Sequence, residues 1–425
     1  MQPHEKPWKA WHKISFRFFF PFLGLTSYLC WDATIYIVHA AFNTDQFDLG
    51  KLYQPLGATL YWLDKHIYHT GFNPKTQQGY PGDNHYGVVF YLTVFFLSVI
   101  IAITWSILDK KRDGYNKLYY WFSLYLRYAL AIVMFGYGID KLIPVQMMHP
   151  GVLAMTMPYG QFNRFAVLWN FMGMSPGYMI FTGACELAAS LLLFSRRTMV
   201  FGYVMIIGIL ANVVALNMFY NITVKLFSSQ LLLYALFLLV PYAKNIFQFF
   251  FKGGTTAFSQ KRFVFQTRRK KYLMRGVLIG VPLVLIVIIS AGTYNRYVRK
   301  TADARREKIY NVTAFVAKDT LSRFMEDSVR WKRLLVNLFN NHVVVFTKDD
   351  NLDWYEYDVD SIKKTFTFHD NPDKRTWKTF NYTYPSNEQL KLAGKWKGRN
   401  VEISMKIWPD DSIPLNQEKV KLVGD

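Results

Sequence analysis

The sequence has little cysteine: only Cys30 and Cys185 occur in 425 residues, and each lies in an apolar stretch. They form no C-x-x-C pair, so the chain offers neither a dithiol redox motif nor a disulfide framework. It also has no P-loop, G-x-S-x-G, H-E-x-x-H or C-x-x-C-H pattern. The sequence therefore shows no complete catalytic motif, and whether the protein is an enzyme stays open at this point.

Charge is also scarce, and it is unevenly distributed. Charged residues make up 19% of the chain and hydrophobic residues 52%, whereas a soluble domain is about 25% charged. Residues 1–292 carry 26 Lys/Arg and 10 Asp/Glu, and residues 293–425 carry 24 and 19. This division excludes a single soluble globule. Because the basic residues lie beside apolar stretches, the net charge of +21 indicates contact with anionic lipid and not with nucleic acid.

Long apolar stretches are abundant. A bilayer core of about 30 Å needs roughly 20 apolar residues per helical crossing. Seven stretches approach or exceed that length: 16–40, 86–108, 119–143, 178–194, 199–219, 226–247 and 276–291. The sequence therefore predicts a mainly α membrane protein with a seven-span helical bundle.

Basic residues predict the orientation of these spans. With the N-terminus inside, the inner segments hold 19 Lys/Arg and the short outer loops hold 5, and positive charge favours the cytoplasmic side. Seven crossings then place the N-terminus in the cytoplasm and the C-terminal domain in the periplasm of a protein of the bacterial inner membrane. The outer connection 144–177, rich in Pro and Gly, is expected to be irregular and to fold over the outer mouth of the helices.

The tail of the chain has a different pattern. From about residue 310 to 408, apolar residues alternate with period two, as in Phe380, Tyr382 and Tyr384, and turn signals such as 397–400 separate the runs. Short alternating runs with turn signals between them are typical of antiparallel strands. We expect a soluble antiparallel β meander of seven or eight strands, closed as a small barrel or a sandwich.

Few ionisable residues lie inside the predicted spans, and each is a functional candidate because burying a charge in a membrane is costly. Glu186 lies at a depth similar to that of Arg127, so it is expected to pair with Arg127, or with Lys141 reaching down from the outer end of its span. Two interpretations stay open. The pair fixes helix packing, or it forms a polar cavity for a headgroup, a quinone carbonyl or a proton.

Several other polar residues are candidates. Asn212 and Asn217 lie in one span and are expected to hydrogen-bond across helices or to contribute to the same intramembrane site. His66, His69 and His85 are the candidates considered for a metal site, but their spacing matches no known signature, and no metal is predicted.

Three segments resemble DoxX-like membrane proteins: FGYGIDKLIPVQM at 135–147, GMSPGYMIFTGACELAASLLLFSRRT at 173–198 and NVVALNMFYNITVKLFSSQLLL at 212–233. The resemblance implies a four-helix membrane unit over about residues 119–250. The family takes its name from a thiosulfate:quinone oxidoreductase subunit, so it also implies quinone as a possible cofactor. The tail, with Gly394-x-Trp396, resembles a lipocalin-like domain, and the pairing is similar to that in Bacteroidetes-type envelopes.

These observations give four expected regions: a two-span region at 1–118, the DoxX-like unit at 119–250, a basic inner loop with the seventh span at 251–293, and a periplasmic β domain at 294–425. The favoured function is binding of a lipophilic molecule, a lipid or quinone, or of a periplasmic or membrane partner protein. The alternatives are a quinone-linked oxidoreductase subunit, which would need a catalytic partner, and a non-catalytic envelope assembly scaffold.

Overall fold

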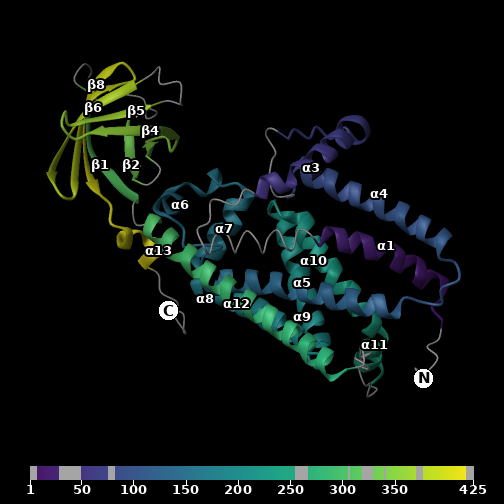
Figure 1. The fold of residues 1–425 in the computed structure, drawn as a ribbon. Helices are drawn as coiled ribbons and strands as arrows, with labels where there is room; N and C mark the ends of the chain where they lie inside the picture. The colour runs from purple at the N-terminus through teal and green to yellow at the C-terminus, as the bar shows by residue number, and fades with distance from the viewer. Residues whose placement is uncertain are drawn as a thin grey trace. The chain divides into compact units, whose positions relative to one another are not determined.

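The computed structural model describes residues 7–27, 49–74, 82–253, 267–304, 307–317, 329–338, 341–369 and 377–417. They form a set of helices followed by a β-barrel (Figure 1). Two compact units are present. The first comprises Met1–Met147 with Val167–Tyr297, and the second comprises Met148–Ala166 with Val298–Asp425.

Helices of 3 to 37 residues make up most of the first unit. In chain order they are α1 (Ala10–Thr26), α3 (Leu49–Leu63), the π-helix η1 (Asp64–Tyr68), α4 (His85–Leu108), α5 (Asn116–Leu142), α7 (Arg164–Met174), α8 (Pro176–Phe194), α9 (Met199–Phe219), α10 (Lys225–Leu239), η3 (Val240–Tyr242), α11 (Ala243–Lys252) and α12 (Arg268–Ala304). Local signals set several ends. The Asn84 side chain accepts a hydrogen bond from the Gly87 N–H at the start of α4, and Pro176 occupies the first turn of α8, where its missing N–H is harmless.

Six of the described helices are long and apolar enough to cross a membrane: His85–Leu108, Asn116–Leu142, Pro176–Phe194, Met199–Phe219, Lys225–Lys252 and Arg268–Ala302. They correspond to the second through seventh predicted stretches, and the last is longer than the sequence predicted. The first predicted stretch is represented by the 17-residue α1, and its residues 28–40 lie outside the described residues. A membrane protein is therefore supported, and the seventh crossing stays a prediction.

Four helices pack in a cycle. Helix α5 contacts α8, α8 contacts α9, α9 contacts α10, and α10 contacts α5. Helices α1 and α4 pack on each other, and their apolar side chains join the same core through residues such as Phe16 and Val89. This cyclic packing encloses the interior of the bundle.

The second unit contains an eight-stranded, closed antiparallel barrel in which each strand pairs with its sequence neighbours and β1 pairs with β8. The strands are β1 (Glu307–Ala317), β2 (Trp331–Asn337), β3 (His342–Thr347), β4 (Leu352–Asp360), β5 (Thr365–His369), β6 (Trp377–Ser386), β7 (Gln389–Trp396) and β8 (Arg399–Ile407). Lys397 and Gly398, with φ of 45° and 80°, form the two-residue turn between β7 and β8, as tight hairpins require. The predicted meander is confirmed, and it closes as a barrel.

Aromatic side chains fill the barrel interior. Trp331 and Trp396 are fully buried, with ring centroids 5.0 Å apart in an edge-to-face arrangement. Phe368 stacks on Trp331 at 6.0 Å. The alternating residues of the tail form this packed core, which stabilises the domain without disulfides.

The outer face of β1, β2 and β3 is covered by the segment 148–166, which contains α6 (Val152–Thr156) and η2 (Tyr159–Gln161), and by the region of η5 (Asp410–Ser412) and α13 (Pro414–Gln417). Val152 packs with Ile309, Leu335 and Val344. The expectation for residues 144–177 therefore changes: they include α6 and α7, and residues 148–166 belong to the barrel unit.

This packing also constrains the topology. Segment 148–166 and the barrel belong to one unit, so they must lie on the same side of the membrane. Four candidate spans separate them in the sequence: Pro176–Phe194, Met199–Phe219, Lys225–Lys252 and Arg268–Ala302. An even number of crossings returns the chain to the side from which it started. The assignment of four spans after α5 therefore agrees with the packing of segment 148–166 against the barrel.

Candidate functional site: a cavity in the helix bundle

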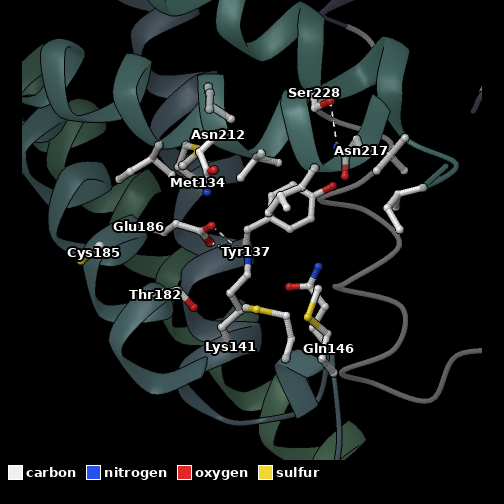
Figure 2. A pocket seen from close by; sticks show the side chains of 18 of the residues that line it. Met134, Tyr137, Lys141, Gln146, Thr182, Cys185, Glu186, Asn212, Asn217 and Ser228 are labelled. Atoms are coloured by element: carbon white, nitrogen blue, oxygen red, sulfur yellow. Dashed lines mark hydrogen bonds and ion pairs between the residues drawn. The ribbon is translucent and has the colours of Figure 1, made fainter. Parts of the chain in front are cut away.

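A cavity of about 390 Å³ lies among α5, α7, α8, α9 and α10 (Figure 2). Its walls are largely apolar, with contributions from Met134, Leu168, Trp169 and Phe227. Polar side chains from all sides of the bundle also line it: Tyr137, Lys141, Gln146, Thr182, Glu186, Asn212, Asn217 and Ser228. A few polar groups in an apolar pocket of this size are typical of small-molecule sites.

The central polar feature is an ion pair between Lys141 of α5 and Glu186 of α8. The Lys141 Nζ atom donates to both carboxylate oxygens, at 2.9 and 2.8 Å from Oε1 and Oε2. Lys141 is 7% exposed and Glu186 is 4% exposed. Each charge is thus neutralised by the other within the bundle.

Two glycines bring this pair together. A Cβ on Gly183 would lie 2.8 Å from three atoms of α5, and a Cβ on Gly138 would lie 2.8 Å from the Leu187 nitrogen. Farther along the two helices, the Ser190 hydroxyl donates to the Ala131 carbonyl at 2.8 Å. Because later residues of α8 thus face earlier residues of α5, the two helices run antiparallel. Lys141 and Glu186 each lie one helical turn beyond a glycine, so the close crossing sets their separation.

Replacing Gly183 by Ala is expected to lower the free energy of unfolding by about 1–3 kcal/mol, because overpacking would force α5 and α8 apart. Thermal unfolding of the detergent-solubilised protein measures the effect. Gly208→Ala is the matched control, since a Cβ on Gly208 in α9 meets no atom within 4 Å. Equal midpoints for the two variants would show that the crossing is not tight.

The turn after α5 positions Gln146 at the cavity. The N–H groups of Val145 and Gln146 both donate to the Asp140 carbonyl at 3.1 Å, which folds the chain back after Pro144. The Gln146 Oε1 atom is buried, and no residue in the described part of the chain donates a hydrogen bond to it. It is therefore an acceptor that a bound molecule could satisfy.

Asp140 has a different role from its neighbour Lys141. Its Oδ1 atom accepts hydrogen bonds from the Thr293 hydroxyl at 2.6 Å and from Arg296 Nη2 at 2.5 Å. Both partners lie on α12. Adjacent residues on a helix point in directions about 100° apart, so Asp140 attaches α12 to the bundle while Lys141 faces the cavity.

The two asparagines line the cavity in different ways. The Asn217 side chain is buried, and its Nδ2 donates to the Ser228 hydroxyl of α10 at 2.9 Å. This is the interhelical hydrogen bond that the sequence suggested. Asn212, five residues earlier on the same helix, is exposed at the edge of the cavity.

The exposed residues of the cavity wall indicate where it opens. Among the lining residues, four are exposed: Tyr178 and Phe181 of α8, and Gly208 and Asn212 of α9. The opening therefore lies between α8 and α9. A Cβ on Gly208 would meet no atom within 4 Å, so there is open space beside this residue.

Arg127 is not among the described residues that line the cavity. Its side chain is 5% exposed, its Nη1 atom lies 2.8 Å from the Met199 sulfur, and its Cζ atom lies 5.3 Å from the Tyr128 ring centre. Glu186 is paired with Lys141. The sequence allowed either cation as its partner, and the structure selects Lys141.

The histidine candidates do not form a metal site in the described part of the chain, where no three His, Cys, Asp or Glu side chains come together. His66 stacks on Trp62 with ring centres 4.8 Å apart. Asp64 accepts hydrogen bonds from the Thr70 and Phe72 N–H groups at 2.8 and 2.9 Å. Burial tends to raise the pKa of the Asp64 carboxyl, but these hydrogen bonds outweigh it and lower that pKa.

The sequence did not identify Gln146, Tyr137, Thr182 or Ser228 as site residues, although the structure places them in the cavity wall. The sequence could have indicated Ser228, because a hydroxyl inside a span needs a hydrogen-bond partner and Asn217 is nearby in the sequence. Gln146 had none, since it follows the end of a span and its position depends on the turn.

Comparisons with known proteins give one informative similarity. No protein-family model matches the chain, and no solved structure matches it. Over 113 residues, the chain is 32% identical to "Uncharacterized protein YwoB" of Bacillus subtilis (strain 168), and the match covers 27% of this chain and 71% of that protein. Over this part of its length, the chain belongs to the same family as the Bacillus subtilis protein YwoB.

Proposed function

We propose that this protein holds a lipophilic molecule, a lipid or a quinone, in the cavity of its helix bundle. The observation that carries the proposal is the combination of an apolar cavity of about 390 Å³, a buried polar group at Lys141 and Glu186, and an opening between α8 and α9. In a membrane, that opening faces hydrocarbon. A molecule with a polar head and an apolar tail would enter from the bilayer without crossing water.

The proposal includes the location of the protein. It is a multi-pass protein of the inner membrane, with seven crossings if residues 16–40 span, a cytoplasmic N-terminus and a periplasmic barrel. The excess of Lys/Arg on the inner segments supports this orientation. The cyclic contacts of α5, α8, α9 and α10 support the DoxX-like four-helix unit as part of the same proposal.

Replacing Gly208 by Trp is expected to remove most of the lipid or quinone that purifies with the protein, because the indole would block the opening. Mass spectrometry of organic extracts measures the bound molecule. Gly280→Trp on α12 is the control, since a Cβ there also meets no atom within 4 Å and the residue does not line the cavity. If both variants keep the same bound molecules as the unmodified protein, the cavity is not the binding site.

The alternative, a quinone-linked oxidoreductase subunit, shares the same cavity and differs in requiring an electron-transferring partner. Absorbance of the purified complex during quinone reduction distinguishes the two. A stoichiometric redox partner with a spectral change would favour the subunit. A scaffold would instead retain a periplasmic protein through the barrel and would be indifferent to Gly208→Trp.

A further inference from the structure

We infer that the cavity selects an uncharged lipid whose head carries a free hydroxyl group, such as a diacylglycerol or a membrane quinol. This inference rests on the proposed function, because it names the class of molecule that the same cavity would hold. Three features of the cavity lead to it: the balanced charges of Lys141 and Glu186 and the amide of Gln146, which Figure 2 labels, and the position of its opening.

The charges of the cavity are already balanced. Of the described residues that line it, only Lys141 and Glu186 carry charge, and the ammonium group donates to both carboxylate oxygens at 2.9 and 2.8 Å. An anionic headgroup would have to compete with Glu186 for Lys141, and a cationic one would have to compete with Lys141 for Glu186. Either would leave a charge buried without a partner, which is strongly unfavourable.

The buried Gln146 Oε1 atom can accept a hydrogen bond from a ligand that carries a donor. Among the residues that the structure describes, none donates to the buried Gln146 Oε1 atom, so a ligand that donates to it would add a hydrogen bond. A hydroxyl group can both donate and accept, so it fits the side-chain amide in either orientation. An ester or a quinone carbonyl can only accept and would not satisfy this oxygen.

The remaining wall and the opening fit hydrocarbon. Met134, Leu168, Trp169 and Phe227 provide apolar surface around the polar group. The exposed lining residues Phe181 and Gly208 mark the opening between α8 and α9, through which an acyl or isoprenoid tail would extend into the bilayer. The head is then bound among polar side chains, and the tail remains in lipid.

The test uses the full-length protein in detergent, stripped of bound lipid and incubated separately with five probes. These are dioleoylglycerol, its acetylated form in which the hydroxyl is capped, dioleoylphosphatidylglycerol, decylubiquinol and decylubiquinone. Retention after gel filtration is measured by mass spectrometry. We expect dioleoylglycerol or decylubiquinol to bind at least about tenfold more tightly than the capped, oxidised or anionic counterpart. The preferred probe of the two hydroxyl compounds identifies the source.

Gln146→Leu localises the preference. This variant should bind capped and hydroxyl-bearing probes within about threefold of each other, whereas Gln161→Leu, the same change at an exposed glutamine outside the cavity wall, should keep the preference. Equal retention of phosphatidylglycerol and dioleoylglycerol, or a preference unchanged by Gln146→Leu, would overturn the inference and leave the proposed function in place. If no probe is retained and Gly208→Trp changes nothing, both the proposed function and this inference fail.

Discussion

Replacing Lys141 by Met is expected to lower the free energy of unfolding by about 3–5 kcal/mol, because the Glu186 carboxylate would remain buried without its partner. The loss is large because Glu186 is 4% exposed and water cannot replace the ammonium group. Unfolding of the purified protein in mixed detergent micelles measures the change. The reversed pair, Lys141→Glu with Glu186→Lys, should recover part of the loss, since opposite charges again face each other.

The barrel supplies a matched control for this prediction. Lys332 pairs with Asp350 at 2.5 Å, but both side chains are about half-exposed. Lys332→Met should therefore change the free energy of unfolding by less than about 1 kcal/mol. If Lys141→Met is no more harmful than Lys332→Met, the buried pair does not stabilise the bundle, and the crossing of α5 and α8 depends on the glycines alone.

The sequence predicted the membrane helices, and it named Glu186 and Lys141 as a possible ion pair while leaving Arg127 as the alternative cation. Apolar length identifies a span because the bilayer has a fixed thickness, and the cost of a buried charge marked Glu186 and Lys141. The sequence could not decide whether Lys141 or Arg127 pairs with Glu186, because the depth of each side chain in the membrane was counted from the predicted ends of its span. The register of α5 against α8 is set by contacts at Gly138 and Gly183, which only the packed structure shows.

Most of the cavity could not be predicted, because it is formed by residues from five helices and two connecting segments. Gln146 illustrates the difficulty. It is a neutral side chain after a span, and two N–H groups donating to the Asp140 carbonyl place it in the wall. No periodicity or motif in the sequence reports such a turn, so its role appears only when the backbone path is known.

The barrel was predicted from alternation, but two strands carry a second signal. Alternation implies one buried face, whereas Leu334, Leu335 and Val336 in β2 are all buried, as are residues 343–346 in β3. Such continuous apolar runs predict that something covers the outer face. The sequence could not identify segment 148–166 as that cover, because it is far away along the chain.

Replacing Val344 by Lys and replacing Val345 by Lys are expected to have different effects, because the two side chains lie on opposite faces of β3. Val345 points into the barrel core and Val344 packs under Val152 on the outside, and both are almost fully buried. A lysine at 345 would place a charge among aromatic rings, at a cost comparable to the 5–15 kcal/mol that stabilises a typical domain. The barrel should then unfold. A lysine at 344 can reach water if segment 148–166 lifts away, so the barrel should survive.

Hydrogen exchange of the full-length protein distinguishes these outcomes. With Val344→Lys, exchange should rise in residues 151–157, which lose their apolar cover, while β5 to β8 stay protected. With Val345→Lys, exchange should rise in all the strands. Two hydrogen bonds also hold the segment, from Gln161 to the Asp350 carbonyl at 2.6 Å and from Arg333 to the Thr156 carbonyl at 3.4 Å. We expect that these two bonds alone do not protect residues 151–157 from hydrogen exchange.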